Sequence, residues 1–194
     1  MSEDNDRKVW YDLLKRISTD CTLCNGSGIM MDATMLSGKE CKICIPKVNA
    51  HYNWNRCALP ARHKIARPKM PNNPKLFDPL VLLKAKAFES CMPIGSTILH
   101  NACANGKSVS YATMSSMILA LKEKHFRFKD VNLLVSDAPI THLDSFLLPE
   151  FDNAISKCRD NGKRLILVEA TASNDVYIKR ILTLYGETQY VYAC

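Results

Sequence analysis

Two Cys-x-x-Cys pairs constrain this chain more than any other feature of its sequence. The first pair is Cys21-Thr22-Leu23-Cys24, and the second, after sixteen further residues, is Cys41-Lys42-Ile43-Cys44. Each pair places two sulfur atoms on one side of a tight turn, and a separation of about 15 to 20 residues is typical of four-thiolate zinc sites. We therefore predict one structural Zn²⁺ held by Cys21, Cys24, Cys41 and Cys44. Four buried thiols, or two disulfides, are the alternative interpretation.

Glycines accompany both pairs. Gly26 and Gly28 follow Cys24 closely, and Gly38 precedes the second pair. Glycine adopts positive φ readily, which lets backbone amides turn back toward thiolates. A hairpin is therefore expected between the two pairs. His51 is a substitute candidate for one of the four ligands.

Composition indicates an ordinary globular protein. The chain has 194 residues, of which 47% are hydrophobic and 23% charged, enough for one mid-sized domain and a small one. No apolar run follows Met1, and none approaches the ~20 residues of a membrane helix, so we expect a cytoplasmic protein that binds no membrane. In that compartment the remaining cysteines should be reduced. They are Cys57, Cys91, Cys103, Cys158 and Cys194.

The N-terminal segment, residues 5–19, has the periodicity of an amphipathic helix. Its apolar stripe consists of Trp10, Leu13, Leu14 and Ile17. Such a stripe either docks into a groove on a partner protein or packs on its own domain, and both alternatives remain open.

A basic stretch covers residues 39–75, where Glu40 is the only acid. Aromatic residues such as Tyr52 and Trp54 are interleaved with the cations, a pattern that suits a surface tracking nucleic-acid phosphates. A net charge of +7 and a pI near 8.9 also favour acidic partners. A solvated helix is the alternative. The candidate nucleic-acid-binding residues are Lys47, Arg56, Arg62, Lys64 and Arg67.

A proline-rich segment, residues 69–79, is predicted to link two domains, residues 1–68 and 80–194. After it, short apolar segments alternate with helical ones, which predicts an α/β domain with a parallel sheet. The expected strands are 108–113, 131–136, 165–170 and 189–193. The expected helices are 80–88, 98–104, 115–124, 143–160 and 175–184.

The order of these parts resembles the zinc-binding replicative-helicase loaders of the DnaC/DnaI type. The resemblance in the N-terminal part rests on residues 21–28, on the second cysteine pair and on Ala58-Leu59-Pro60-Ala61-Arg62. In the C-terminal part it rests on residues 106–113 and on Val131-Asn132-Leu133-Leu134-Val135-Ser136-Asp137. The last of these segments is similar to a Walker B strand. It implies a small zinc domain followed by a reduced AAA+-like, P-loop-type domain.

The nucleotide site implied by this resemblance is degenerate. A P-loop needs glycines that wrap the phosphates and a lysine that neutralises them, whereas Gly95-Ser96-Thr97, expected to open helix 98–104, lacks the lysine. Asp137 is followed by Ala138 where the family has a second acid. We therefore expect no catalytic residues and no ATP hydrolysis.

The leading hypothesis is a non-enzymatic adaptor, encoded by a phage or mobile element, that recruits or inhibits a hexameric replicative DNA helicase through its zinc domain. Single-stranded DNA is a second candidate partner. One alternative is an atypical ATPase that uses Ser96, Thr97 and Asp137. The other is a zinc-finger regulator that binds nucleic acid.

Overall fold

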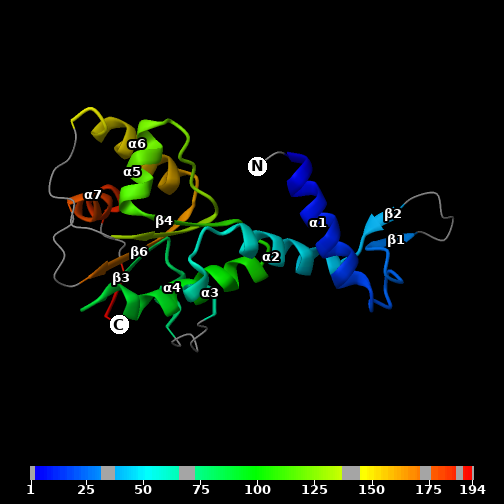
Figure 1. Cartoon of the computed structure of the whole chain (residues 1–194). Coiled ribbons are helices and arrows are strands. Elements are labelled where there is room, and N and C mark those ends of the chain that lie inside the picture. The colour runs from blue at the N-terminus through cyan, green and yellow to red at the C-terminus, as the bar shows by residue number, and fades with distance from the viewer. Residues whose placement is uncertain are drawn as a thin grey trace. The chain divides into compact units, whose positions relative to one another are not determined.

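The computed structural model describes residues 3–31, 38–65, 73–136, 145–170, 176–186 and 190–193 (Figure 1). The chain divides into two compact units, Met1–Arg56 with Asn101–Lys107, and Cys57–His100 with Ser108–Cys194. The first unit therefore ends earlier than the predicted domain 1–68. The predicted linker lies partly outside the described residues, and its described end contains the 3-10 helix η1 (Pro74–Phe77). Among the described residues, no helix combines the length and apolarity needed to cross a membrane.

The first unit is built from two helices and a hairpin. It contains α1 (Glu3–Ser18), the antiparallel strands β1 (Ile29–Met31) and β2 (Gly38–Glu40), and α2 (Cys44–Arg56). The helices α1 and α2 pack on each other, with Leu13 and Val48 buried. The Trp10 indole donates a hydrogen bond of 3.0 Å to Asn49 Oδ1. The predicted N-terminal helix and the hairpin between the cysteine pairs are thus both present.

The second unit is built on a five-stranded sheet whose neighbouring strands are all parallel. Its strands are β3 (Leu80–Ala85), β4 (Val109–Thr113), β5 (Val131–Val135), β6 (Arg164–Ala170) and β7 (Tyr190–Ala193), in the order β4-β5-β6-β3-β7. A parallel sheet is covered on both faces, which explains why β3, β5 and β6 read as nearly continuous apolar runs. The predicted α/β class is confirmed. A short helix, α3 (Ala61–Ile65), also belongs to this unit.

Helices cover both faces of the sheet (Figure 1). One face carries α5 (Met114–Lys122), α6 (Leu148–Asp160) and α7 (Val176–Tyr185), whose buried side chains form one core with Leu82, Leu134 and Leu167. The other face carries α4 (Phe88–Ala104). The helix α4 approaches closely at Gly95, where a Cβ atom would lie 2.9 Å from Leu133 Cδ1. Glycine is therefore needed at that position for helix and strand to pack.

One predicted helix was wrong, and a second begins earlier than predicted. Residues 80–88 form β3 followed by the start of α4, and the helix expected at residue 98 begins at Phe88. A short, fully apolar run is compatible with a buried helix or a buried strand, so periodicity could not separate them. Pro93 lies in the second turn of α4, where it removes one backbone hydrogen bond without ending the helix.

The cysteines outside the two pairs are not uniformly reduced. Cys57, Cys103 and Cys158 are free thiols, whereas Cys91 is disulfide-bonded. The expectation that all five are reduced was therefore wrong for Cys91. Cys194 lies outside the described residues. Disulfide pairing depends on which parts of the chain the fold brings together, and the sequence spacing of these cysteines contains no such information.

Candidate metal centre

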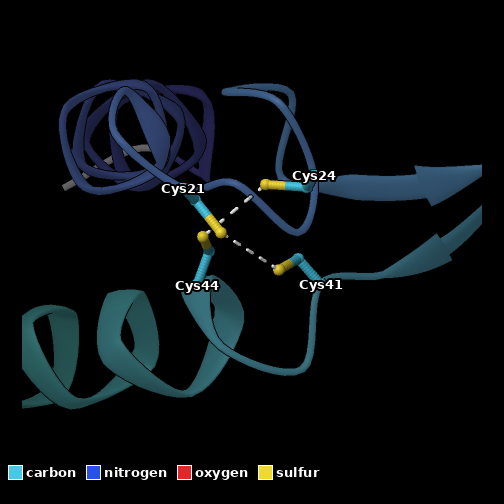
Figure 2. A group of neighbouring side chains, drawn as sticks. All are labelled: Cys21, Cys24, Cys41 and Cys44. Atoms are coloured by element: carbon cyan, nitrogen blue, oxygen red, sulfur yellow. Dashed lines mark hydrogen bonds between the residues drawn. The ribbon is translucent and has the colours of Figure 1, made fainter.

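The four predicted zinc ligands converge at one point in the first unit (Figure 2). Their sulfur atoms all lie within 4.8 Å of one another. The Sγ atoms of Cys21 and Cys41 are 3.8 Å apart, and those of Cys24 and Cys44 are 3.7 Å apart. Tetrahedral coordination with a Zn–S bond of about 2.3 Å requires sulfur atoms about 3.8 Å apart. The donor set and its spacing therefore fit zinc.

The cluster is enclosed by protein. Cys24, Cys41 and Cys44 are each at most 5% exposed, and Leu14 and Met30 pack against this cluster of cysteines. Four protein thiolates fill a tetrahedral coordination sphere, so no position remains for a water molecule or a substrate. This arrangement suits a structural metal ion and offers no metal-based catalysis.

The loop after the first pair depends on Gly28. This residue has φ +74°, and a Cβ atom on it would lie 2.7 Å from Leu14 Cδ1. Its amide donates to Cys24 Sγ at 3.3 Å, and its carbonyl accepts from the Cys41 amide at 2.9 Å. One glycine therefore joins the two cysteine pairs while leaving room for the leucine that covers them.

Further hydrogen bonds fix the ends of the flanking helices. The buried Ser18 hydroxyl, at the end of α1, donates to the Gly26 carbonyl at 2.6 Å. Cys44 is the first residue of α2, so its sulfur lies at the positive end of the helix dipole. The hydrogen bond therefore ties the end of α1 to the loop that follows the first cysteine pair.

The electrostatic environment favours thiolate at the first cysteine of each pair. A hydrogen bond from the Cys24 amide lowers the pKa of Cys21 to about 6. The Cys44 amide likewise lowers the pKa of Cys41, whereas burial raises the pKa of Cys44. Metal ligation requires deprotonated sulfur, and a bound cation removes the remaining protons. The site therefore starts with part of the negative charge that Zn²⁺ needs.

His51 is exposed on α2 and takes no part in this cluster. Within the described ranges, the four cysteines form the one group of three or more residues suited to holding a metal ion. The substitute ligand considered from the sequence is thus not brought to the site.

The apolar stripe of α1 packs on its own unit. Leu13 is buried, Trp10, Leu14 and Ile17 are half-buried, and Leu14 contacts the cysteine cluster. Of the two alternatives left open by the sequence, internal packing is the one observed. The stripe's side chains are therefore largely committed to α2 and to the metal site.

The predicted basic stretch is divided between the two units. Lys47 and Arg56 lie exposed on α2, while Arg62 and Lys64 belong to α3 in the second unit. Arg67 lies outside the described residues. Arg56 forms an ion pair of 3.0 Å with Asp6 and stacks on the Tyr52 ring. These cations do not form one continuous element, and their role in nucleic-acid binding stays a prediction.

The residues proposed for a degenerate nucleotide site lie within α4. Gly95, Ser96 and Thr97 are in its interior and not at its start, because the connection from β3 is only residues 86–87. The buried Ser96 hydroxyl donates to the His63 carbonyl at 2.7 Å, and Thr97 Oγ1 donates to the Pro93 carbonyl at 2.8 Å. The expected helix start at these residues was wrong. Asp137 lies outside the described residues.

An ion pair that the sequence did not indicate lies near the carboxyl ends of β3 and β6. Lys84 Nζ is 3.1 Å from Glu169 Oε2, and Glu169 is only 4% exposed. The two residues are opposite each other in the strand register, but nothing in the local sequence pairs them. The alternation of aromatic and basic residues at Phe126-Arg127-Phe128 is a second feature that the sequence analysis does not single out.

The chain matches no protein-family model, and no curated protein is similar to it at a significant level.

Proposed function

We propose that this protein is a zinc-stabilised adaptor, similar to helicase loaders of the DnaC/DnaI type, which binds a hexameric replicative DNA helicase and does not hydrolyse ATP. The observation that carries the proposal is the closed four-cysteine cluster in a compact unit of its own. A zinc module of this kind gains its stability from the metal and can present a fixed surface to a partner.

The sheet order supports an AAA+-like second unit. In chain order, the first strand of this unit is β3, and it lies between the fourth strand, β6, and the fifth, β7. The third strand, β5, lies on the other side of β6. An AAA+ core has the same arrangement. The strand similar to a Walker B strand, β5, is the third strand of this unit and lies beside the fourth, β6.

Three features support the loss of ATP hydrolysis. The two-residue connection between β3 and α4 leaves no room for a phosphate-wrapping loop. Gly95 is occupied in helix packing against Leu133. Lys84, the cation near the carboxyl end of β3, already has a carboxylate partner in Glu169. Titration calorimetry with Mg-ATP should therefore detect no binding, whereas micromolar affinity would favour the atypical ATPase.

The helicase-binding surface that we propose consists of exposed apolar side chains around the metal centre. Leu23 and Ile43, one in each cysteine pair, are 40% and 45% exposed, and Ile29 and Met31 on β1 are more exposed still. Apolar side chains held rigidly on a zinc knuckle are suited to act as interface anchors. They replace the inward-packed stripe of α1 as the expected contact.

Co-elution with the host's replicative helicase on size-exclusion chromatography tests the proposal. The full-length protein should form a complex, and Leu23→Ser with Ile43→Ser should weaken it at least about 30-fold if these are hot-spot residues. A matched control, Leu119→Ser with Phe146→Ser, removes two exposed apolar side chains from the second unit and should leave affinity unchanged. No complex at all would overturn the adaptor, and equal binding by both variants would overturn the surface.

A further inference from the structure

A pocket of about 400 Å³ lies within the second unit, at the edge of the sheet where β5 and β6 begin. Its volume falls in the usual range for small-ligand sites. This edge is opposite the carboxyl ends of the strands, so the pocket is separate from the region discussed for nucleotide binding. The residues that line it are Phe126, Arg127, Phe128, Ala154, Lys157, Cys158, Asn161 and Lys163.

The loop that carries the two phenylalanines is anchored at its end. Buried Asn132 accepts a hydrogen bond from the Lys129 amide at 2.8 Å and donates to the Lys129 carbonyl at 3.0 Å. Asp130 accepts from Lys163 Nζ at 2.7 Å and from the Ser108 hydroxyl at 2.6 Å. These bonds fix one wall of the pocket, so a ligand would not have to order it.

The walls and floor suit a flat, apolar group. The Phe126 and Phe128 rings lie edge to face, with centroids 4.9 Å apart, and both are half-buried against the core. Cys158 lies buried in the floor and accepts a hydrogen bond from the Tyr185 hydroxyl at 3.3 Å. Burial raises the pKa of the Cys158 thiol to about 11, so the floor is uncharged at neutral pH.

The rim is cationic. Within the described part of the chain, Arg127 and Lys157 form no ion pair. Residues 122–130 and 157–163 together contain seven lysines and arginines but three acids. Two of these acids already have a cationic partner, in the pairs Asp130–Lys163 and Asp160–Arg159, and Glu123 lies 3.2 Å from the His125 ring nitrogen. The positive charge of Arg127 and Lys157 is therefore available to an anionic ligand.

We propose that this pocket binds single-stranded nucleic acid, with one unpaired base against the Phe126 and Phe128 rings and the flanking phosphates on Arg127 and Lys157. Aromatic faces stack on any base, and cations follow the backbone, which is how sequence-tolerant single-strand sites work. A duplex keeps its bases paired and cannot fill the pocket. An acidic peptide would satisfy the cations but would leave the aromatic walls without a planar partner. The inference does not depend on binding to a helicase.

Fluorescence anisotropy with the full-length protein and a labelled oligothymidine of about 15 nucleotides tests the proposal. Arg127→Ala with Lys157→Ala should weaken binding about tenfold or more. The slope of log affinity against log salt should fall by about 1.4, because each single-strand phosphate contact contributes about 0.7. The control Lys86→Ala with Lys179→Ala removes the same charge from exposed positions elsewhere in the unit and should leave the slope unchanged.

A second variant, Phe128→Leu, keeps an apolar side chain against the core but removes the aromatic face. It should weaken binding at least about fivefold without changing the salt slope. Four results would overturn the proposal: no binding to the oligonucleotide, equal losses in the Arg127 variant and its control, no effect of Phe128→Leu, or equally tight binding to a duplex. Displacement of the oligonucleotide by polyglutamate at equal concentration would assign the pocket to acidic peptides instead.

Discussion

Replacing Gly28 with alanine should destabilise the first unit by two separable effects. An L-residue at φ +74° costs about 1–2 kcal/mol of backbone strain. The new Cβ would also lie 2.7 Å from Leu14 Cδ1, and such overpacking costs about 1–3 kcal/mol. The free energy of unfolding should therefore fall by about 2–5 kcal/mol.

Gly26→Ala provides the matched control. Gly26 has φ +80°, but a Cβ on it would meet nothing closer than 3.6 Å. Gly26→Ala should therefore lower the free energy of unfolding only by the backbone strain, about 1–2 kcal/mol. The difference between the two variants measures the contact with Leu14.

Urea unfolding followed by tryptophan fluorescence suits this comparison. Both tryptophans, Trp10 and Trp54, belong to the first unit, so their emission reports on that unit. In a Leu14→Ala background, Gly28→Ala should lower the free energy of unfolding by no more than Gly26→Ala does. The reason is that the new Cβ no longer overlaps with the leucine side chain. Equal destabilisation by Gly28→Ala and Gly26→Ala in the wild-type background would refute this account of the loop.

Two further predictions concern the second unit. Asp130→Asn should lower the free energy of unfolding at pH 7 by about 1–2 kcal/mol, allowing for solvent screening of a side chain that is 38% exposed. Lys163 and Ser108 hold the pKa of Asp130 well below its usual range. The stabilisation is therefore present above the unfolded pKa of about 3.9 and is lost as the pH falls below that value. Urea unfolding followed by circular dichroism should show a smaller difference in the free energy of unfolding between wild type and variant at about pH 3 than at pH 7. Lys84→Met should lower the free energy of unfolding by about 1–3 kcal/mol, because it leaves the Glu169 carboxylate buried without its cation. Adding Glu169→Gln should recover part of that loss. No recovery would mean that Lys84 acts through packing alone.

The metal ligands could be predicted because their signal is local. Two sulfur atoms three residues apart, repeated after a short loop, define the site whatever the rest of the chain does. The strands β4, β5 and β6 were also predicted to within one or two residues, since each is a short segment with aliphatic, β-branched or aromatic residues between polar turns. The parallel sheet followed from their alternation with helices.

Features that depend on distant contacts could not be predicted. The interior strand β3 was mistaken for a helix because both of its faces are buried and its sequence lacks alternation. The basic stretch was grouped by position along the chain, whereas the cations around the pocket, Arg127 and Lys157, are thirty residues apart and meet only in the fold. The inward orientation of Leu14 likewise depends on where Gly28 lies.

The central claim is that a zinc ion organises the first unit. X-ray absorption at the zinc edge, on full-length protein purified without chelator, measures both the metal content and its ligands. The account predicts one zinc per chain with four sulfur neighbours at about 2.3 Å, and loss of that zinc in Cys21→Ser with Cys41→Ser. Well under one zinc per chain, nitrogen or oxygen in the coordination sphere, or unchanged zinc in the double variant would contradict it.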